Sequence, residues 1–156
     1  MAYNIVVNSN ESINNISTGV KQYTFDFGFM EEGCEYDLKF SYRSEIGDFI
    51  PNSEDVSAIS IPELVTRNTY QVSSDIGAGA RFFSSSTLGL VYLQMADLGT
   101  DTHRIYHEAK FGDNPPCRVT KPSQQTFRVI QEHLTGILMS PPDYLLILHF
   151  SKVYKK

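Results

Sequence analysis

The sequence predicts an all-β protein whose antiparallel strands form a two-sheet sandwich or a closed barrel. Three observations lead to this fold class. Apolar and polar residues alternate in several short runs, which is the period of a strand with one buried face. Turn-forming residues separate these runs at short intervals, a spacing typical of sandwiches and barrels with about eight to ten strands. The composition includes nine Tyr and ten Phe but no Trp, and aromatic residues favour strands.

The clearest alternation lies in residues 21–43, where two aromatic runs flank a turn. In each run four apolar side chains occupy alternate positions: Tyr23, Phe25, Phe27 and Phe29 in the first, and Tyr36, Leu38, Phe40 and Tyr42 in the second. Alternate side chains of a strand point to the same face, so each run predicts a strand with its aromatic face in the core. The connection at 30–35 contains Gly33, which predicts a hairpin loop with a positive φ angle.

Shorter elements flank this pair of runs. Residues 4–8 predict a short strand, and the Ser- and Asn-rich segment that follows, through Gly19, is typical of an arm or a long loop. Weak alternation predicts strands at 56–61, which Pro62 ends, and at 68–73. The run 87–96 is apolar at both parities and fits a strand buried on both faces or a short helix. Its β-rich neighbourhood and Gly89 favour the strand.

The C-terminal half predicts three further strands, at 102–111, 126–133 and 143–153. The last of them has the densest apolar centre, at residues 144–148, and is expected to be a central strand. The chain therefore divides into an N-terminal strand and arm at 1–20, one β domain at 21–153 and a basic tail at 154–156.

Composition and charge argue against several classes of protein. A formal net charge of −5 argues against a general nucleic-acid binder, because such a binder needs clustered Lys and Arg. No stretch approaches the roughly 20 apolar residues of a membrane span. The first residues lack the pattern of a secretory signal, so we expect no independent export. The spacing of Cys34 and Cys117 matches no zinc or redox motif, and free thiols are favoured over a bridge.

No catalytic, cofactor-binding or metal-binding motif is present in the sequence. The chain has no phosphate-binding loop, no dinucleotide fingerprint and no nucleophile elbow. On a strand, His103 and His107 would lie about 13 Å apart, too far for one metal ion. We therefore expect no cofactor, no metal and no enzymatic activity. Scattered residues that converge in the fold remain an open alternative.

The order of elements resembles the single jelly-roll proteins of viral capsids. The resemblance rests on the arm NIVVNSNESINN, the strands YTFDFGF and EYDLKFSY with a glycine turn between them, TYQV, the approach NPPCRV and the closing strand PDYLLILHF. The resemblance covers nearly the whole chain. Within this class, the chain resembles the minor capsid or penton-type proteins of large double-stranded DNA viruses. The resemblance implies an antiparallel single jelly roll of about eight strands in two sheets.

The resemblance also implies a role and a location. The chain would be a structural component of the virion, assembled in the host cytoplasm. It would join or cap neighbouring subunits, namely a major capsid protein and copies of itself. Candidate interaction residues lie in the polar arm, in the loop 45–55 and in the turn 112–116: Asn8, Asn10, Asn14, Asn15, Asp48, Phe49, Asp113 and Asn114.

Other functions stay open. A carbohydrate-binding, lectin-like sandwich would present exposed aromatic side chains, for which Tyr3, Tyr42, Tyr70, Tyr92, Tyr106 and Tyr154 are candidates. An oligomeric receptor-binding trimer and an enzyme are further alternatives.

Overall fold

The computed structural model describes residues 2–9, 14–17, 20–47, 56–66, 68, 71–73, 80–97, 103–133 and 143–153. Within these ranges the chain forms twelve strands and no α-helix, which confirms the all-β class. The strands are β1 (Ala2–Asn8), β2 (Asn14–Ser17), β3 (Val20–Thr24), β4 (Glu35–Gly47), β5 (Val56–Ser60), β6 (Gln71–Ser73), β7 (Ala80–Phe82), β8 (Thr87–Asp97), β9 (His103–Ala109), β10 (Cys117–Thr120), β11 (Thr126–His133) and β12 (Asp143–Lys152).

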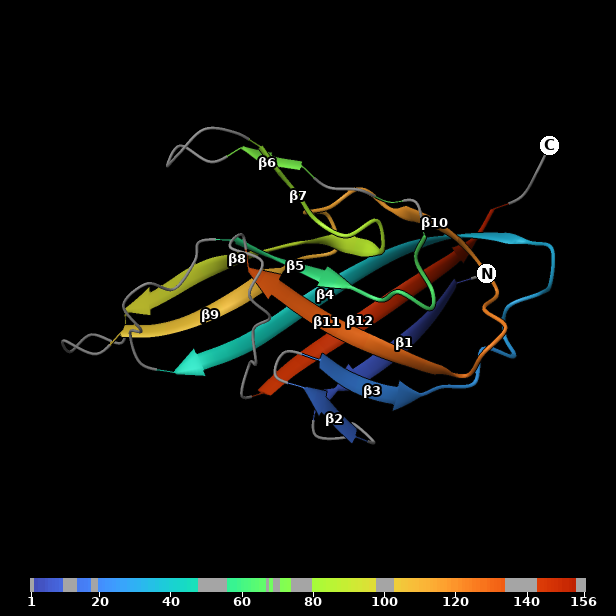
Figure 1. Cartoon of the computed structure of the whole chain (residues 1–156), viewed down its shortest axis with the longest axis horizontal. Coiled ribbons are helices and arrows are strands. Elements are labelled where there is room, and N and C mark those ends of the chain that lie inside the picture. The colour runs from blue at the N-terminus through green and yellow to red at the C-terminus, as the bar shows by residue number, and fades with distance from the viewer. Residues whose placement is uncertain are drawn as a thin grey trace.

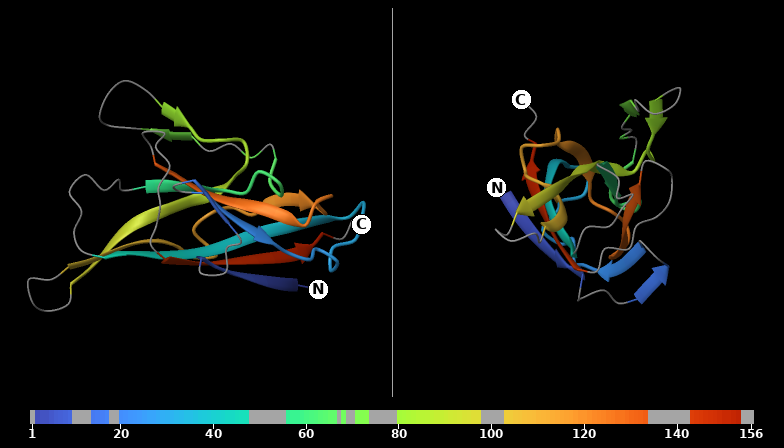
Figure 2. Two further views of the ribbon diagram at one scale, coloured as in Figure 1. Left: turned by 60° about the horizontal axis from the view of Figure 1, so that its bottom comes forward. Right: turned by 90° about the vertical axis from the view of Figure 1, so that its left-hand side faces the viewer.

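Ten of these strands form one continuous antiparallel sheet (Figure 1). Its order is β1-β12-β4-β9-β8-β5-β11-β3-β2, with β10 paired to β4, while β6 and β7 form a separate pair. The sequence predicts either a sandwich of two separate sheets or a closed barrel. The two parts of the sheet are joined here because β8 and β9 pair along Tyr92–Asp97 and His103–Glu108. The sheet curls into a half-barrel, which the end-on view in Figure 2 shows.

The core fills the inside of the curl. Buried side chains alternate along β4, as the sequence predicts, and also along β12: Tyr36, Leu38, Phe40 and Tyr42 on β4, and Tyr144, Leu146, Leu148 and Phe150 on β12. The far part of the sheet faces them. The Tyr42 hydroxyl donates a hydrogen bond to Gln131 Oε1 of β11 at 2.6 Å, and the hydroxyls of Tyr144 and Tyr23 of β3 are also hydrogen-bonded. These contacts hold the two parts of the curl together.

The predicted hairpin of residues 21–43 is wrong in its first half. β3 ends at Thr24 and pairs with β11 and β2, whereas β4 pairs with β12, β9 and β10. After β3 the backbone turns, because the Asp26 carboxylate accepts a hydrogen bond from the Gly28 N–H at 2.8 Å. The aromatic residues of this segment still pack on the core, with Phe27 fully buried. Gly33 has the expected positive φ, at 77°.

The N-terminal residues 2–8 and 14–17 belong to the sheet. β1 pairs with β12 from Ala2↔Ser151 to Asn8↔Leu145, and its side chains Ile5 and Val7 are part of the core. β2 pairs with β3 at the opposite end of the strand order. The residues between β1 and β2, at 10–13, lie outside the described part of the chain.

Several other predicted strands are confirmed. β8 covers the ambiguous run 87–96 as a strand, and β9 and β11 match the runs at 102–111 and 126–133. β12 lies between β1 and β4, so it is an internal strand as expected. Cys34 and Cys117 are both free thiols.

Candidate interaction surface

The outer face of the sheet presents a row of side chains in register across five strands. Asn8 on β1 pairs with Leu145 on β12, which pairs with Arg43 on β4. Arg43 pairs in turn with Glu108 on β9, and Glu108 with Tyr92 on β8. Paired residues in a sheet point to the same face. The row therefore places an aliphatic, an ionic and an aromatic side chain side by side on the surface.

In the part of the chain that the structure describes, four large apolar side chains are exposed around this row, and we call them the outer apolar band. They are Val6, Leu145, Tyr92 and Phe111, with exposed fractions of 55%, 42%, 40% and 39%. Val6 lies beside Ile147 in the pairing of β1 with β12. Phe111 follows β9, and its ring lies 6.0 Å from the His149 ring of β12. A gathering of exposed apolar residues is typical of a contact surface.

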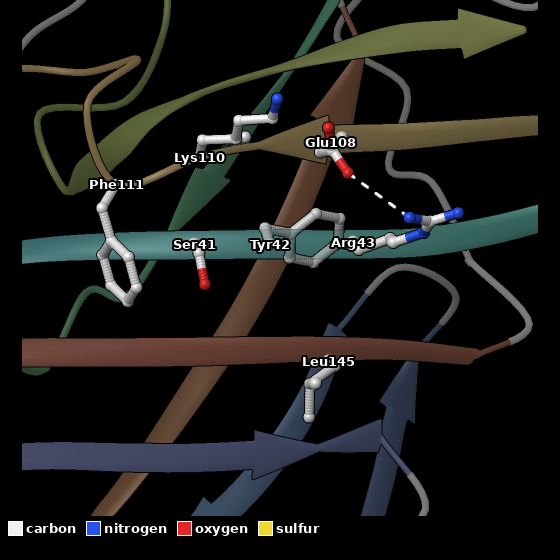
Figure 3. Close-up of a pocket in the computed structure, with 8 residues that line it drawn as sticks. Ser41, Tyr42, Arg43, Glu108, Lys110, Phe111 and Leu145 are labelled. Atoms are coloured by element: carbon white, nitrogen blue, oxygen red, sulfur yellow. Dashed lines mark ion pairs between the residues drawn. The ribbon is translucent and has the colours of Figure 1, made fainter.

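An open groove of about 310 Å³ lies within the outer apolar band (Figure 3). It is lined by Ser41, Tyr42, Arg43, Glu108, Ala109, Lys110, Phe111 and Leu145. Phe111 lies at one end, Arg43 with Glu108 at the other, and Leu145 at the side formed by β12. The groove therefore offers apolar walls with charged groups at its rim, a composition suited to a side chain of another protein.

Arg43 lies at the charged end of the groove and makes two contacts there. Its Nη1 lies 3.6 Å from Glu108 Oε2, and its guanidinium carbon lies 4.3 Å from the centre of the Tyr106 ring. Because Arg43 is more than half exposed, the ion pair contributes at most about 1 kcal/mol. The two contacts orient the guanidinium along the sheet and cover one side of the Tyr106 ring.

Cys117 is a buried thiol that lies beside a surface hollow. A polar hollow of about 440 Å³ includes Cys117 in its lining. Burial raises the pKa of its thiol to about 11. The Asn68 Nδ2 donates to its sulfur at 2.9 Å, and the thiol donates to the Leu88 carbonyl at 3.4 Å. The thiol is therefore protonated at neutral pH, and its contacts connect β10 to β8 in a structural role.

The predicted interaction residues do not form one site. Asn8 lies in the row on the outer face, while Asn14 and Asn15 lie in β2 at the other end of the strand order. Asp113 is exposed, and its Oδ2 accepts a hydrogen bond from the Lys110 N–H at 2.7 Å, which closes its own turn. Asn10, Asp48 and Phe49 lie outside the described residues.

Asn114, predicted as a surface contact, has an internal role instead. It is only 9% exposed, and its side chain bonds to both backbone groups of Leu90. The Leu90 N–H donates to Asn114 Oδ1 and Asn114 Nδ2 donates to the Leu90 carbonyl, each at 2.9 Å. These two hydrogen bonds attach the turn after β9 to β8. The side-chain amide of Asn114 takes the place that the backbone of a neighbouring strand would have. The amide is thus used within the chain.

Sequence reasoning missed the outer apolar band for an identifiable reason. Residues 144–148 are apolar at both parities, and this density predicts a central strand without indicating which side chains are exposed. In the structure only Tyr144, Leu146 and Leu148 of this run are buried. The odd-numbered members, Leu145 and Ile147, lie on the outer face. The signal available in the sequence was the presence of apolar residues at both parities of one strand.

No family model, no curated protein and no solved structure matches the chain. Among the residues that the structure describes, no helix has the length and apolar character needed to cross a membrane. The same residues contain no group of three or more His, Cys, Asp or Glu side chains placed to hold a metal ion.

Proposed function

We propose that the chain is a non-enzymatic structural subunit of a viral capsid, of the minor capsid or penton type, folded as a single jelly roll. In this role it joins or caps neighbouring subunits, which are a major capsid protein and copies of itself. It acts in the virion and is assembled in the host cytoplasm. The observation that carries the proposal is the order of the strands in the sheet.

Eight of the ten strands of the curled sheet can be compared with a jelly roll. Numbered along the chain, the strands β1, β3, β4, β5, β8, β9, β11 and β12 lie in the order one, eight, three, six and then five, four, seven, two. A jelly roll has one sheet of its first, eighth, third and sixth strands and another of its second, seventh, fourth and fifth. This agreement supports the jelly roll. β2, β10 and the β6–β7 pair are then additions to it.

The outer apolar band supports a role in contacts between proteins. Val6, Leu145 and Phe111 lie exposed on one face, and Leu145 and Phe111 line the groove. A shell subunit needs such surfaces, because its neighbours must cover apolar area to hold it in place. The rim of the groove carries Arg43, Glu108 and Lys110, and charges at a rim select the partner more than they strengthen the contact.

The proposal is tested by co-expression of the chain with the proteins encoded beside it in its source genome. We expect the chain to sediment with particles in a density gradient and to be identified there by mass spectrometry. Leu145→Glu with Phe111→Glu should abolish this incorporation, because a neighbouring subunit that covers the groove would then have to dehydrate two added carboxylates.

A matched control separates the surface from general charge effects. Ser123→Glu with Gln124→Glu adds the same charge at exposed positions away from the outer apolar band and should leave incorporation unchanged. A chain that is absent from purified particles, or a groove variant that enters them as well as the control, would contradict the proposal.

A carbohydrate-binding module is the second candidate, and the exposed ring of Tyr92 favours it. Tyr92 lies next to Glu108 in the row, so a stacking ring and a hydrogen-bonding carboxylate are neighbours. Other tyrosines argue less well for it, because Tyr42 is buried and the ring of Tyr106 lies under Arg43. Tyr70 and Tyr154 lie outside the described residues. Binding to a glycan array that is lost in Tyr92→Ala would support this candidate over the capsid role.

A further inference from the structure

The edge strand β1 differs from the strand at the other edge of the sheet. Among the described strands β1 pairs with β12 alone, and β2 pairs with β3 alone. β2 has four residues, and its register shifts between Asn15 and Ser17. Short length and irregular register are two ways in which proteins protect an edge from pairing with another chain. β2 therefore carries such protection.

β1 lacks these protections. It has seven residues, Ala2–Asn8, and its register with β12 is continuous from one end to the other. It contains no proline and no charged residue. Its centre is occupied by Ile5, Val6 and Val7, and Val6 is the most exposed large apolar side chain of the described residues. A long, regular and uncharged edge with apolar residues is a template for another strand.

We propose that the β1 edge is a homodimer interface, in which β1 of two copies pair in antiparallel orientation about a two-fold axis and join their sheets. The proposal rests on the edge strand and holds for the chain whether or not it builds a capsid. It identifies the occupant of the edge as a second copy of this chain.

The residues of β1 fit a copy of themselves. Full overlap of Ala2–Asn8 with its copy places Ile5 at the two-fold axis, and Asn4 opposite Val6 of the partner subunit. Opposed residues then have the same parity. The exposed side chains Asn4 and Val6 meet exposed side chains of the copy, and buried ones meet buried ones. A register shifted by one residue would break this match, so the strand is self-complementary in one family of registers.

The charges around the edge permit this pairing in spite of the net charge of −5. No residue of β1 is charged, and the neighbouring positions on the outer face of β12 are Leu145, Ile147 and His149. Two copies would therefore bring no carboxylates opposite each other at the centre of the interface. Pairing would also cover part of the exposed Val6 side chain.

The opposition of Asn4 and Val6 allows a charge-swap experiment on the full chain. Asn4→Lys with Val6→Lys places lysines directly opposite each other twice across the two-fold axis. Like charges in opposed positions destabilise strand pairing. Light scattering after size exclusion should give twice the 17.6 kDa chain mass for the native chain and the single chain mass for this variant.

A second variant tests the register. Asn4→Lys with Val6→Glu places each lysine opposite a glutamate of the copy, so the dimer mass should return. Gln94→Lys with Gln124→Lys adds two positive charges at exposed positions away from the edge and should leave the dimer intact. Circular dichroism establishes that each variant is folded.

Hydrogen exchange of the native chain gives a reading that needs no variant. The amides of β1 that face away from β12 should exchange more slowly as the protein concentration rises, and those of β2 should not change. A native chain that stays monomeric at high concentration, a two-lysine variant that keeps the dimer, or a lysine–glutamate variant that does not restore it would overturn the proposal. Each outcome is independent of incorporation into particles, which tests the capsid role.

Discussion

Gly89 and Asn114 meet at the point where the turn after β9 is fastened to β8. A Cβ atom at Gly89 would lie 2.5 Å from Asn114 Cγ and 2.7 Å from Phe40 Cε1, closer than real contacts allow. The absence of a side chain at Gly89 thus makes room for the amide that bonds to both backbone groups of Leu90. This arrangement brings together two residues that are far apart in the sequence.

Gly89→Ala is therefore expected to lower the free energy of unfolding by roughly 2 to 4 kcal/mol, since it combines overpacking against Phe40 with displaced hydrogen bonds of Asn114. Urea unfolding followed by circular dichroism measures the change. Gly112→Ala is the matched control, because a Cβ at Gly112 meets nothing within 4 Å. Equal stability of the two variants would show that Asn114 does not bind β8 in this way.

The sequence predicts the burial of single residues correctly where apolar and polar residues alternate strictly. The four apolar positions of β4 from Tyr36 to Tyr42 are buried as expected. It did not indicate the role of Asn114, because an asparagine in a turn with Gly and Pro fits a solvated loop equally well. Only the fold brings β8 within reach of that amide. The roles of Gly89 and Asn114 therefore depend on a contact that no local pattern encodes.

At the scale of elements, the alternating runs in the sequence predict several strands correctly, but they do not predict which strands pair with each other. Alternation identifies which face of a strand is buried, and it carries no information on the strand that lies beside it. For this reason the sequence predicts a hairpin of β3 and β4, although β9, β8, β5 and β11 lie between them in the sheet order. The run 25–29 was expected to be a strand because its aromatics alternate. Those residues pack on the core from an irregular segment instead.

The position of β1 in the fold also differs from the prediction. The sequence predicts that residues 1–20 form a strand and arm separate from the β domain at 21–153, whereas the structure places Ile5 of β1 in the core with 2% exposure. Ile5→Ala should lower the free energy of unfolding by roughly 2 to 4 kcal/mol. Leu145→Ala, a truncation on the exposed face of the neighbouring strand, should change it by less than about 0.5 kcal/mol.

Both values come from urea unfolding at low protein concentration, where pairing of copies does not contribute. If Ile5→Ala costs no more than Leu145→Ala, then β1 is a dispensable arm and the core is complete without it.

At the scale of the whole molecule, a buried group of polar side chains joins the two parts of the curl. Tyr42 and Tyr144 come from neighbouring strands, with their rings stacked at a centroid distance of 5.3 Å. Their hydroxyls bond to Gln131 of β11 and Tyr23 of β3, on the opposite side of the core. The group closes the half-barrel by hydrogen bonds in a place where the strands themselves do not pair.

This group makes the stability of the whole fold sensitive to alkaline pH. Burial is the main cause that raises the pKa of both Tyr42 and Tyr144 far above the usual value of a tyrosine. An unfolded tyrosine loses its proton near pH 10, so above that pH the unfolded chain binds fewer protons than the folded one. The contribution to stability is complete below about pH 10. Above it, each of the two tyrosines subtracts about 1.4 kcal/mol per pH unit.

We expect urea unfolding midpoints that fall steeply as the pH rises above about 10, with tyrosinate absorbance from these residues appearing only on unfolding. Tyr144→Phe should reduce the slope, because one of the two buried phenols is removed. Tyr92→Phe, on the exposed face, should leave the slope unchanged. A stability that stays level through this range would mean that the phenols are hydrated in the folded state. The two parts of the curl would then lack the dry contact that closes the half-barrel.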